Sequence, residues 1–502
     1  MNFNELLNLV SSDNPRNICV DSRTVGEGDI FVAVKGTACD GHDFINQALT
    51  NGAKYIVCQQ IPNINGWQPQ TQLGACPERS RGDGLLCASN IETIIVDDSI
   101  EAAALLAQTI RGNPSCYLTN LAVTGTNGKT TVAFLVRSCI QQAGQKCGLL
   151  GTVIYDTCSG NSCEAILTTP DCMTIAAGQE EMLKNGAEYM VIEASSHALS
   201  QNRLAGINFK AAAFTNLAGD HLDYHKTEKD YLAAKSILFS TLSHDAVAVL
   251  NKQSPHAASI AKQTEAKILW YAIDEQADII ARIESMDTGG TVFEMEYAGQ
   301  SAAVTTPLLG LYNVSNCLAA TGLCLAAGFD LETIAAGLSA LKTIPGRLEK
   351  IDFNCDFSVL VDYAHTDDAL KNVLSTLKPL CKGRLIAVFG CGGDRDKTKR
   401  PRMARVAEQL ADLIIVTSDN PRTEQPDDII KDIIAGFENP DSQTIVIEPD
   451  RKKAIESAIR TAGKNDIVLI AGKGHETYQI IGKQKFDFSD KQIAQEYLKK
   501  LK

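Results

Sequence analysis

The chain has 502 residues, of which 44% are apolar and 21% are charged, a composition typical of folded globular proteins. This length predicts about three domains, each able to bury its own core. The formal net charge of −13 argues against a nucleic acid or an anionic membrane as partner. We therefore expect small-molecule ligands, with any anionic ligand bound by local basic clusters.

The N-terminal residues Met1 to Glu5 lack the basic and apolar regions of a secretory signal, and no run is apolar and long enough to span a bilayer. We therefore expect a cytoplasmic protein. The 16 cysteines are scattered and no two are spaced Cys-x-x-Cys, which favours reduced thiols over a disulfide framework. The oligomeric state stays open, with a monomer as our expectation.

The first predicted domain covers residues 1–113. Short apolar runs at residues 18–20, 30–34 and 55–58 alternate with turns, which predicts a small α/β domain. Residues 61–90 are rich in Pro, Gln, Gly and Ser and lack periodicity. We expect them to form a mobile surface insertion between two strands, without a catalytic role.

Two further α/β domains are predicted at residues 114–343 and 344–502. Strand-like runs at residues 188–193, 210–215, 245–250 and 268–272 alternate with helical patterns, as do later runs at 358–361, 385–389, 413–416 and 467–470. Such alternation predicts mostly parallel sheets covered by helices. We predict a P-loop ATPase-like central domain and a Rossmann-like C-terminal domain.

A glycine-rich turn, Thr124-Gly125-Thr126-Asn127-Gly128-Lys129-Thr130, joins the apolar run at residues 121–123 to a helix beginning near Thr131. Its backbone N–H groups can converge on phosphate, Lys129 can reach the terminal phosphates, and the Thr130 hydroxyl can hold magnesium. The first glycine of the usual P-loop pattern would fall on Val123, so a chance Gly-Lys-Thr turn is the alternative. The strand–turn–helix context favours a nucleoside triphosphate site.

Polar clusters follow the predicted strands of both later domains, where open α/β sheets bind ligands. They begin at Glu193, Asn216, Asp362, Gly390, Ser418 and Gly472. Two such edges facing one another across a cleft would bring a nucleotide against a second substrate, which is the layout of a ligase. Glu193 and His221 are candidate magnesium ligands beside Thr130; the alternatives for His221 and His225 are a surface helical pair or a zinc site.

Taken together, six motifs resemble the Mur ligases of peptidoglycan synthesis. They are the phosphate loop, Thr168-Thr169-Pro170, Glu193 to Leu199, Asp220 to His225, Asp362 to His365, and Gly472 to Glu476. The similarity spans nearly the whole chain apart from residues 61–90. It implies an ATP-dependent ligase that adds meso-2,6-diaminopimelate to UDP-N-acetylmuramoyl-L-alanyl-D-glutamate through an acyl phosphate, in cell-wall precursor synthesis.

The resemblance also implies a catalytic group of Lys129, Lys235, His221 and Glu193 acting with ATP and two Mg²⁺ ions. Lys235 matches a lysine that carries a carbamate formed from carbon dioxide, although the sequence alone would favour a solvated helix lysine. Thr130, Glu193, His221 and carbamylated Lys235 would be the metal ligands. The nucleotide would contact Gly125, Thr126, Asn127, Gly128, Lys129, Thr130, Thr131, Asn313, Arg347, Asp362 and His365, with a helix cap as the alternative for Asn313.

Two further sets of residues match substrate positions of the family. For the UDP-muramoyl dipeptide, the residues that match the UDP end are Val20, Ser22, Thr37, Ala38 and Cys39 in the first domain. Those that match the dipeptide end are Thr168, Thr169, Ser195, Gln201 and Arg203, with ordinary strand-end polarity as the alternative. For diaminopimelate they are Arg395, Asp419, Asn420, Pro421, Arg422, Gly472 and Glu476. Arg422 and Arg395 could grip the distal carboxylate, which lysine lacks.

Alternatives remain at several levels. Residues 395–405 could form a solvated basic face or a nucleic-acid patch, and Arg422 could cap a turn. Asp367, Thr398 and Gln492 depart from the family pattern, where Pro, Gly and Glu are usual, and Asp367 puts some nucleotide contacts in doubt. The competing functions are a lysine-adding relative, folylpolyglutamate synthase, and a nucleotide-regulated binding or scaffold protein.

Overall fold

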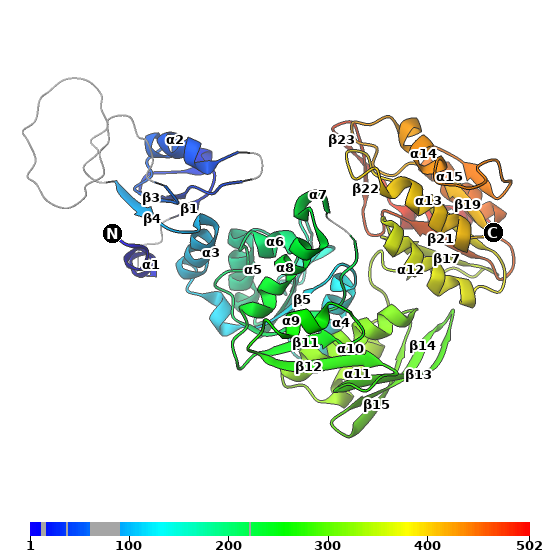
Figure 1. The fold of residues 1–502 in the computed structure, drawn as a ribbon, viewed down its shortest axis with the longest axis horizontal. Coiled ribbons are helices and arrows are strands. Elements are labelled where there is room, and N and C mark those ends of the chain that lie inside the picture. Colours follow the sequence, from blue (N-terminus) through cyan, green and yellow to red (C-terminus); the bar gives the residue numbers. More distant parts are fainter. Residues whose placement is uncertain (12–16, 37–38, 61–90, 220–221, 502) are drawn as a thin grey trace, which may run out of the picture.

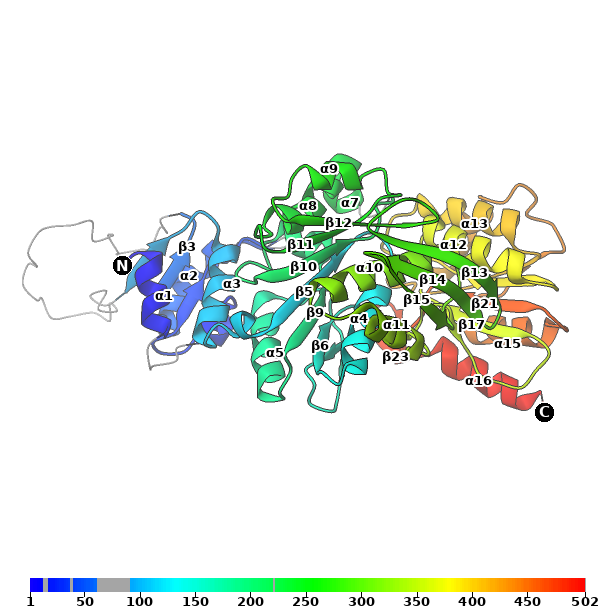
Figure 2. The same cartoon turned by 90° about the horizontal axis from the view of Figure 1, so that it is seen from below.

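The computed structural model describes residues 1–11, 17–36, 39–60, 91–219 and 222–501, which form three α/β domains arranged in a row (Figure 1, Figure 2). The predicted three-domain α/β architecture is therefore confirmed. The insertion predicted at residues 61–90 lies outside the described residues. No described helix combines the length and apolar character needed to cross a bilayer.

The N-terminal domain consists of α1 (Phe3–Ser11), β1 (Ile18–Cys19), β2 (Ile30–Val32), α2 (Ile45–Thr50), β3 (Tyr55–Cys58), β4 (Glu92–Ile95) and α3 (Ser99–Ile110). Its strands form a parallel sheet in the order β1-β2-β3-β4. Successive β2 side chains face opposite sides, so Ile30 and Val32 pack with α1 and α3 while Phe31 packs with α2. The second strand ends two residues earlier than predicted, because the chain turns so that Gly41 N–H bonds the Val34 carbonyl at 2.9 Å.

The central domain begins with β5 (Thr119–Thr124), α4 (Lys129–Gln142), β6 (Cys147–Leu150), β7 (Ile154–Asp156), β8 (Cys163–Glu164), α5 (Cys172–Lys184), β9 (Tyr189–Glu193), α6 (Ser196–Ser200), β10 (Phe209–Phe214), α7 (Leu222–His225) and α8 (Glu228–Ser240). It continues with β11 (Val247–Asn251), α9 (Ala257–Ala261), β12 (Lys267–Ile273), β13 (Ile279–Asp287), β14 (Gly290–Tyr297), β15 (Gln300–Thr306), α10 (Leu311–Ala326) and α11 (Leu331–Ala340). Its sheet order is β15-β14-β13-β12-β11-β10-β5-β9-β6-β7-β8.

The phosphate-loop strand β5 lies inside this sheet, between β10 and β9, to both of which it is parallel. Its side chains alternate between two cores. Leu121 and Val123 pack with α4, α10 and α11, whereas Ala122 packs with α5, α8 and α9. The sequence did not predict the antiparallel extension β13-β14-β15, which projects beneath the C-terminal domain in Figure 1.

The C-terminal domain consists of β16 (Glu349–Lys350), β17 (Ser358–Asp362), α12 (Asp367–Leu377), β18 (Leu385–Phe389), α13 (Lys399–Leu410), β19 (Leu413–Val416), α14 (Pro426–Ile434), β20 (Ile445–Ile447), α15 (Arg451–Thr461), β21 (Ile467–Ala471), the hairpin β22 (Tyr478–Ile481) and β23 (Gln484–Asp487), and α16 (Asp490–Lys500). The sheet order is β16-β17-β21-β18-β19-β20, with β16 antiparallel. Helices α12, α13 and α14 cover one face, and α15 and α16 cover the other.

Candidate active site

The phosphate loop between β5 and α4 can be formed only with glycine at two positions. Gly125 and Gly128 have φ angles of 150° and 93°. A Cβ atom on Gly125 would lie 1.9 Å from Thr215 Oγ1, and one on Gly128 would lie 2.3 Å from Asn316 Oδ1. Lys129, the first residue of α4, donates from Nζ to the Gly125 and Thr126 carbonyls, both at 2.9 Å. The loop therefore wraps around its lysine and leads into a helix N-terminus, which is a favourable position for an anion such as phosphate.

Glu193, at the end of β9, is fully buried beside this loop. Its carboxylate accepts hydrogen bonds from Thr130 Oγ1 at 3.0 Å, Thr152 N at 2.8 Å and Thr152 Oγ1 at 2.9 Å. A Cβ on Gly151 would approach Glu193 Oε1 to 2.3 Å, so the close approach requires glycine. Carboxylate and hydroxyl oxygens therefore lie side by side here, and oxygen atoms are the ligands that Mg²⁺ prefers. Thr152 was missed by the sequence analysis, although Gly151-Thr152 follows the end of β6.

Lys235 lies under the phosphate loop on α8 and is 1% exposed. Its Nζ donates to the Gly125 carbonyl at 2.8 Å and lies 4.4 Å from the centre of the Tyr231 ring. It is therefore not the solvated helix lysine of the alternative interpretation. The predicted partner His221 lies outside the described residues.

Arg347 connects the C-terminal domain to the phosphate loop. Its Nη2 donates to Thr130 Oγ1 at 3.1 Å, its guanidinium lies 5.0 Å from the Tyr363 ring centre, and its Nε is buried without a hydrogen-bond partner among the described residues. A second link across the junction runs from Asn127 Nδ2 to Asp368 Oδ2 at 3.1 Å. A buried donor without a hydrogen-bond partner lowers the stability of the folded protein. An anionic ligand that accepted a hydrogen bond from Arg347 would remove this cost.

These groups line a cavity of about 480 Å³ between the central and C-terminal domains, here called the nucleotide cavity. Of the residues predicted to contact nucleotide or metal, it is lined by Thr126, Asn127, Gly128, Lys129, Thr130, Thr131, Glu193, Asn313, Arg347, Asp362 and His365. Gly125 and Lys235 do not line it. Burial raises the pKa of the Asp362 carboxyl, whose oxygens accept from Leu348 N at 2.6 Å and Ala364 N at 2.8 Å.

The five residues predicted to hold the dipeptide form one hydrogen-bonded group at the end of β9. Thr169 Oγ1 donates to the Glu193 carbonyl at 2.7 Å and bonds Ser195 Oγ at 3.0 Å. Arg203 bonds the Thr169 carbonyl at 3.0 Å through Nη1 and Gln201 Oε1 at 2.9 Å through Nε. Thr168 Oγ1 joins the group through Thr152 Oγ1 at 3.1 Å. Ser195 also caps α6, so part of its polarity is structural.

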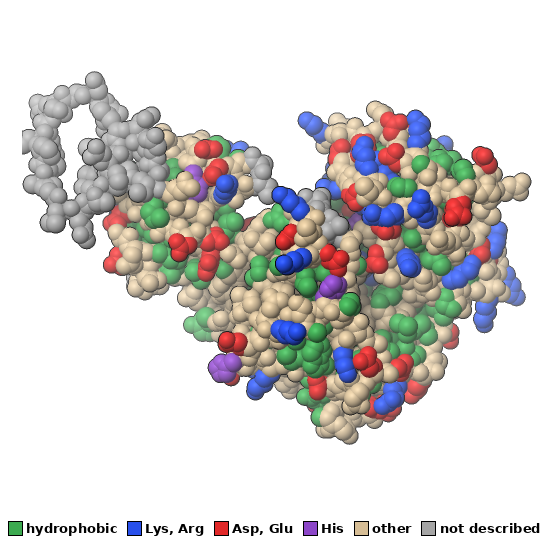
Figure 3. All heavy atoms as spheres, in the orientation of Figure 1, with side chains coloured by type: hydrophobic (Ala, Val, Ile, Leu, Met, Phe, Trp, Pro, Cys, Tyr) green, Lys and Arg blue, Asp and Glu red, His purple; other side chains and the backbone are tan. Residues whose placement is uncertain are grey.

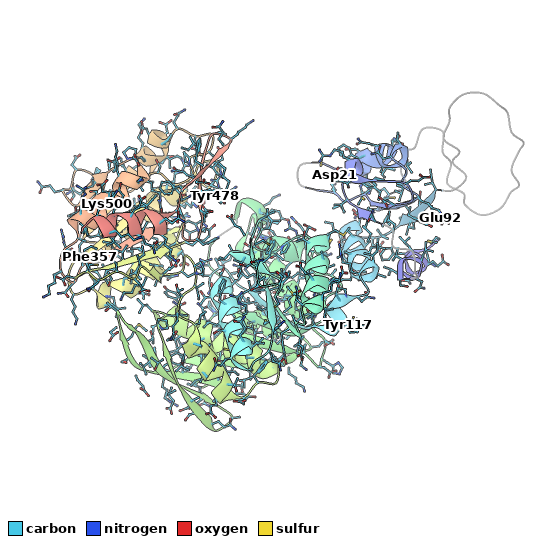
Figure 4. All side chains as sticks on the ribbon, turned by 180° about the vertical axis from the view of Figure 1, so that it is seen from behind. Asp21, Glu92, Tyr117, Phe357, Tyr478 and Lys500 are labelled. Atoms are coloured by element: carbon cyan, nitrogen blue, oxygen red, sulfur yellow. The ribbon has the colours of Figure 1, made fainter. Side chains whose placement is uncertain are left out.

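The residues predicted to hold the UDP end lie in the N-terminal domain, away from this group. Ser22 is buried and donates to Gln47 Oε1 at 2.8 Å, while Val20 and Cys39 are exposed. None of the three lines the nucleotide cavity or the second cavity described below. Thr37 and Ala38 lie outside the described residues. Figure 3 shows a broad hollow between the N-terminal and C-terminal domains, and Figure 4 places Asp21 on the side of its domain nearer the C-terminal domain.

A second cavity of about 670 Å³, here called the amino-acid cavity, adjoins the first. Its lining includes six of the predicted diaminopimelate contacts: Arg395, Asp419, Asn420, Arg422, Gly472 and Glu476. Both cavities are lined by Tyr363, His365 and Thr366, which form a common wall. The two sheet edges therefore meet at one place, with Lys129 on one side of this wall and Arg422 on the other.

Arg422 has a left-handed backbone (φ 51°) and donates from Nη1 to the Gly393 carbonyl at 2.9 Å. Its neighbour Thr423 is bonded by Asp394, so Asp394 fastens the two loops together. Behind them Arg400 is fully buried and pairs with Glu424 at 2.9 Å. Residues 395–405 are therefore not a uniformly solvated basic face.

Two buried cations of this region were missed by the sequence analysis. Arg451 pairs with Asp490 at 2.7 Å and also donates to the carbonyls of Ala471 at 2.9 Å and Ser418 at 3.2 Å. It thereby clamps the ends of β21 and β19, the strands that lead to Gly472 and Asp419. Lys473 is buried among the predicted amino-acid contacts. Arg451 is the first residue of α15 and Lys473 lies in the turn after β21, so neither position carries a periodic signal that could reveal burial.

The three departures from the family pattern have structural partners. Arg402 bonds Asp367 at 3.0 Å through Nε and Thr398 Oγ1 at 3.4 Å through Nη1, so two of the departures meet on one guanidinium at the amino-acid cavity. Gln492 N–H bonds the cap residue Ser489 at 3.4 Å at the start of α16. Glutamine and glutamate are both suited to this third helical position.

Comparisons with known proteins cover nearly the whole chain. Residues 15–111 match the family description "Mur ligase family, catalytic domain", residues 123–324 match "Mur ligase middle domain", and residues 346–474 match "Mur ligase, glutamate ligase domain". A UDP-N-acetylmuramoyl-L-alanyl-D-glutamate--2,6-diaminopimelate ligase of Geobacillus thermodenitrificans is 41% identical over 486 residues, which are 96% of this chain and 94% of the relative. A protein of the same name from Gloeobacter violaceus is 42% identical over 484 residues, which are also 96% of this chain and 94% of the relative.

Solved structures give the same result. A structure of a UDP-N-acetylmuramoyl-L-alanyl-D-glutamate--2,6-diaminopimelate ligase is 33% identical, with a TM-score of 0.67 over 97% of this chain and 95% of the other. MurF from Acinetobacter baumannii shares the fold, with a TM-score of 0.63 over 99% of this chain and 98% of the other at 19% identity. The resemblance inferred from the motifs is therefore confirmed, and the chain belongs to the Mur ligase family.

Proposed function

We propose that this chain is an ATP-dependent ligase that adds meso-2,6-diaminopimelate to UDP-N-acetylmuramoyl-L-alanyl-D-glutamate through an acyl phosphate. One observation carries the proposal: the nucleotide cavity and the amino-acid cavity share the wall of Tyr363, His365 and Thr366. A carboxylate activated on one side of this wall is therefore within reach of an amine bound on the other. The names of the relatives described above support the choice of substrates.

For ATP, we propose the phosphate loop with Asn313, Arg347, Asp362 and His365 as contacts. Thr130 and Glu193 are proposed as magnesium ligands with His221 and a carbamate on Lys235, and two ions are expected. The fit rests on the buried Glu193 carboxylate beside the Thr130 hydroxyl and on Arg347 Nε, from which no described residue accepts a hydrogen bond. ATP and a carboxylate are both anions, so magnesium, Lys129 and Arg347 would lower the repulsion between them.

For the first substrate, we propose that Thr168, Thr169, Ser195, Gln201 and Arg203 hold the dipeptide and that the N-terminal domain holds the UDP end. The hydrogen bonds among these five residues support the first assignment, because they hold the residues beside Glu193. The domain boundaries proposed here are 1–113, 114–343 and 344–502. We expect the protein to act as a monomer on small molecules.

For the amine, we propose Arg395, Asp419, Asn420, Pro421, Arg422, Gly472 and Glu476. A lysine substrate has no distal carboxylate, so it would leave the guanidiniums of Arg422 and Arg395 without an anionic partner. The resulting loss is about 2 kcal/mol, which is about 30-fold in selectivity. This difference disfavours the lysine-adding alternative.

The test is phosphate release from ATP, measured with each substrate omitted in turn and with L-lysine in place of meso-diaminopimelate. The ligase predicts release only when ATP, the UDP-muramoyl dipeptide and diaminopimelate are all present, together with formation of the tripeptide product. Equal turnover with lysine would favour the lysine-adding relative. Phosphate release that does not depend on either substrate, or no phosphate release at all, would favour a nucleotide-regulated binding protein.

A further inference from the structure

Lys473 is a buried cation in the turn that follows β21. Its side chain is 0% exposed. Its Nζ donates to Glu476 Oε2 at 2.9 Å and to Asn420 Oδ1 at 3.0 Å, and lies 3.5 Å from Asp419 Oδ1. Three of the proposed amino-acid contacts therefore converge on one ammonium group.

The same contacts fix how these three side chains are oriented. Asn420 Nδ2 donates to Glu476 Oε2 at 2.9 Å, and Asn420 Oδ1 also accepts from Ile480 N at 3.0 Å. Asn420 therefore presents its amide oxygen to Lys473 and its amide nitrogen to Glu476. Asp419 is 6% exposed, and its Oδ1 has no hydrogen-bond partner among the described residues. This oxygen is paired with Lys473 by charge, at 3.5 Å, and keeps the capacity to accept a hydrogen bond.

The charges of this cluster explain what such a donor would be. Asp419 and Glu476 carry one negative charge each and Lys473 carries one positive charge. Arg451, whose charge also acts on both carboxylates, is paired with Asp490, so the five groups together carry one net negative charge. Arg422 and Arg395 line the same cavity and supply positive charge. The distal centre of a diamino acid with two carboxylates carries one ammonium and one carboxylate, which matches this arrangement.

We propose that Lys473 is a positioning residue that sets the charge of the amino-acid cavity so that it accepts one ammonium group. This inference rests on the proposed function. Without Lys473, two carboxylates would remain buried together, which is costly because like charges in a low-dielectric site repel one another. Asn420 and Glu476 would also lose the group that holds them in place, so binding of the amino acid would suffer more than binding of ATP.

The experiment is a double-mutant cycle on Lys473→Met and Asp419→Asn, with KM for meso-diaminopimelate, KM for ATP and kcat as the measurements. Lys473→Met leaves two negative charges, Asp419→Asn leaves none, and the double variant restores the single negative charge of the wild type. We expect KM for diaminopimelate to rise about 30-fold in Lys473→Met and about 10-fold in Asp419→Asn, but no more than about 10-fold in the double variant. KM for ATP should stay within about 3-fold of wild type.

A matched control is Lys485→Met. Lys485 is exposed and its Nζ lies 3.6 Å from the centre of the Tyr478 ring, which Lys473 also approaches, at 5.6 Å. It makes the same type of ring contact outside the carboxylate cluster, so its loss should leave all three constants unchanged. Figure 4 places Tyr478 on the side of the C-terminal domain that faces the centre of the molecule.

The proposal is overturned if the single effects multiply, so that the double variant is about 300-fold worse, because a purely structural role predicts independent damage. If Lys473→Met does not fold, the double variant is compared with Asp419→Asn alone, and a higher KM in the double variant overturns the proposal. A wild-type enzyme that does not consume diaminopimelate would refute the proposed function itself. An active wild type with multiplying effects would refute only the role of Lys473.

Discussion

The nucleotide cavity and the amino-acid cavity lie at the ends of two similar sheets, but they are built from different parts of the chain. Around the phosphate loop, the two glycines and the carbonyls that receive Lys129 belong to the backbone. Around the amino-acid cavity, charged side chains dominate the lining, and buried ion pairs hold them. Backbone groups recognise phosphate, which all nucleoside triphosphates share, whereas side-chain charges can distinguish one amino acid from another.

This difference predicts two types of mutational effect. Changes near the phosphate loop should lower turnover with every amino acid, because they act on a step common to all of them. Changes near Arg422 and Lys473 should alter KM for the amino acid and leave KM for ATP unaltered. Four further experiments follow, from the largest expected effect to the smallest.

The largest effect is expected for Lys235→Ala, at the buried cation beneath the phosphate loop. If Lys235 carries the proposed carbamate, its loss should lower kcat about 1,000-fold, since charge stabilisation at the phosphates would be reduced. Short carboxylates such as acetate or formate should restore part of the activity by entering the vacated space. The exposed Lys229 on the same helix provides the control, and Lys229→Ala should behave as wild type. Full activity in Lys235→Ala would contradict the assignment.

The next effect is on stability, at the ion pair behind the amino-acid cavity. Arg451→Met leaves Asp490 buried without its partner, so the free energy of unfolding should fall by about 3 kcal/mol, measured by denaturant titration. KM for diaminopimelate should rise as well, because the ends of β19 and β21 lose their clamp. Arg460→Met removes a 66% exposed arginine of the same helix and should change stability by less than about 0.5 kcal/mol. Equal losses in both variants would remove the clamp argument.

A smaller and more selective effect is expected for Arg422→Ala. The loss of a charge-assisted bond to the distal carboxylate should raise KM for diaminopimelate about 30-fold and leave KM for ATP near its original value. Arg405→Ala, at an exposed residue of α13 outside the cavity lining, is the control. Equal increases in the two Michaelis constants would show that Arg422 supports the fold rather than selecting the amino acid.

The smallest effect concerns His475, in the turn after β21, whose ring centre lies 5.1 Å from that of Tyr363. Burial, reinforced by the charge of Arg347, lowers the pKa of His475 from 6.5 to about 4. As pH falls from 7 to 5, His475 becomes protonated in the unfolded chain but stays neutral in the folded chain. The free energy of unfolding therefore decreases. This histidine should contribute about 1–2 kcal/mol of that decrease.

The comparison for this prediction is His475→Gln, in which the loss of stability between pH 7 and pH 5 should be smaller by the same amount. Chemical denaturation at the two pH values measures both slopes. The control His244→Gln changes a histidine that is 80% exposed and should keep the wild-type slope. Identical slopes in wild type and His475→Gln would contradict the burial argument.

The sequence predicted the parallel sheets and the gathering of the nucleotide residues, because both follow from local pattern. Apolar runs marked the strands, and polar residues after them had to meet at the sheet edge. The meander of β13, β14 and β15 was missed. The turn at Ala298-Gly299 has positive φ at both residues, as in a tight hairpin, but this angle is known only from the structure. Its strands are partly exposed and carry charges, which weakened the apolar signal.

The buried cations were not predictable in the same way. Lys473 and Arg451 are polar by type, and only long-range contacts show that they are buried. Asp367 and Thr398 appeared as separate departures from the family pattern, and only the fold shows that both contact Arg402. Sequence pattern therefore located the cavity, whereas the network that orients its charges required coordinates.

Tyr363, His365 and Thr366 belong to one short turn after β17, and this turn is the partition between the two cavities. The two cavities are thus separated by side chains of a single loop segment. A ligand in either cavity would therefore contact residues that also line the other cavity. A single substitution in the turn would therefore change the lining of both cavities at once.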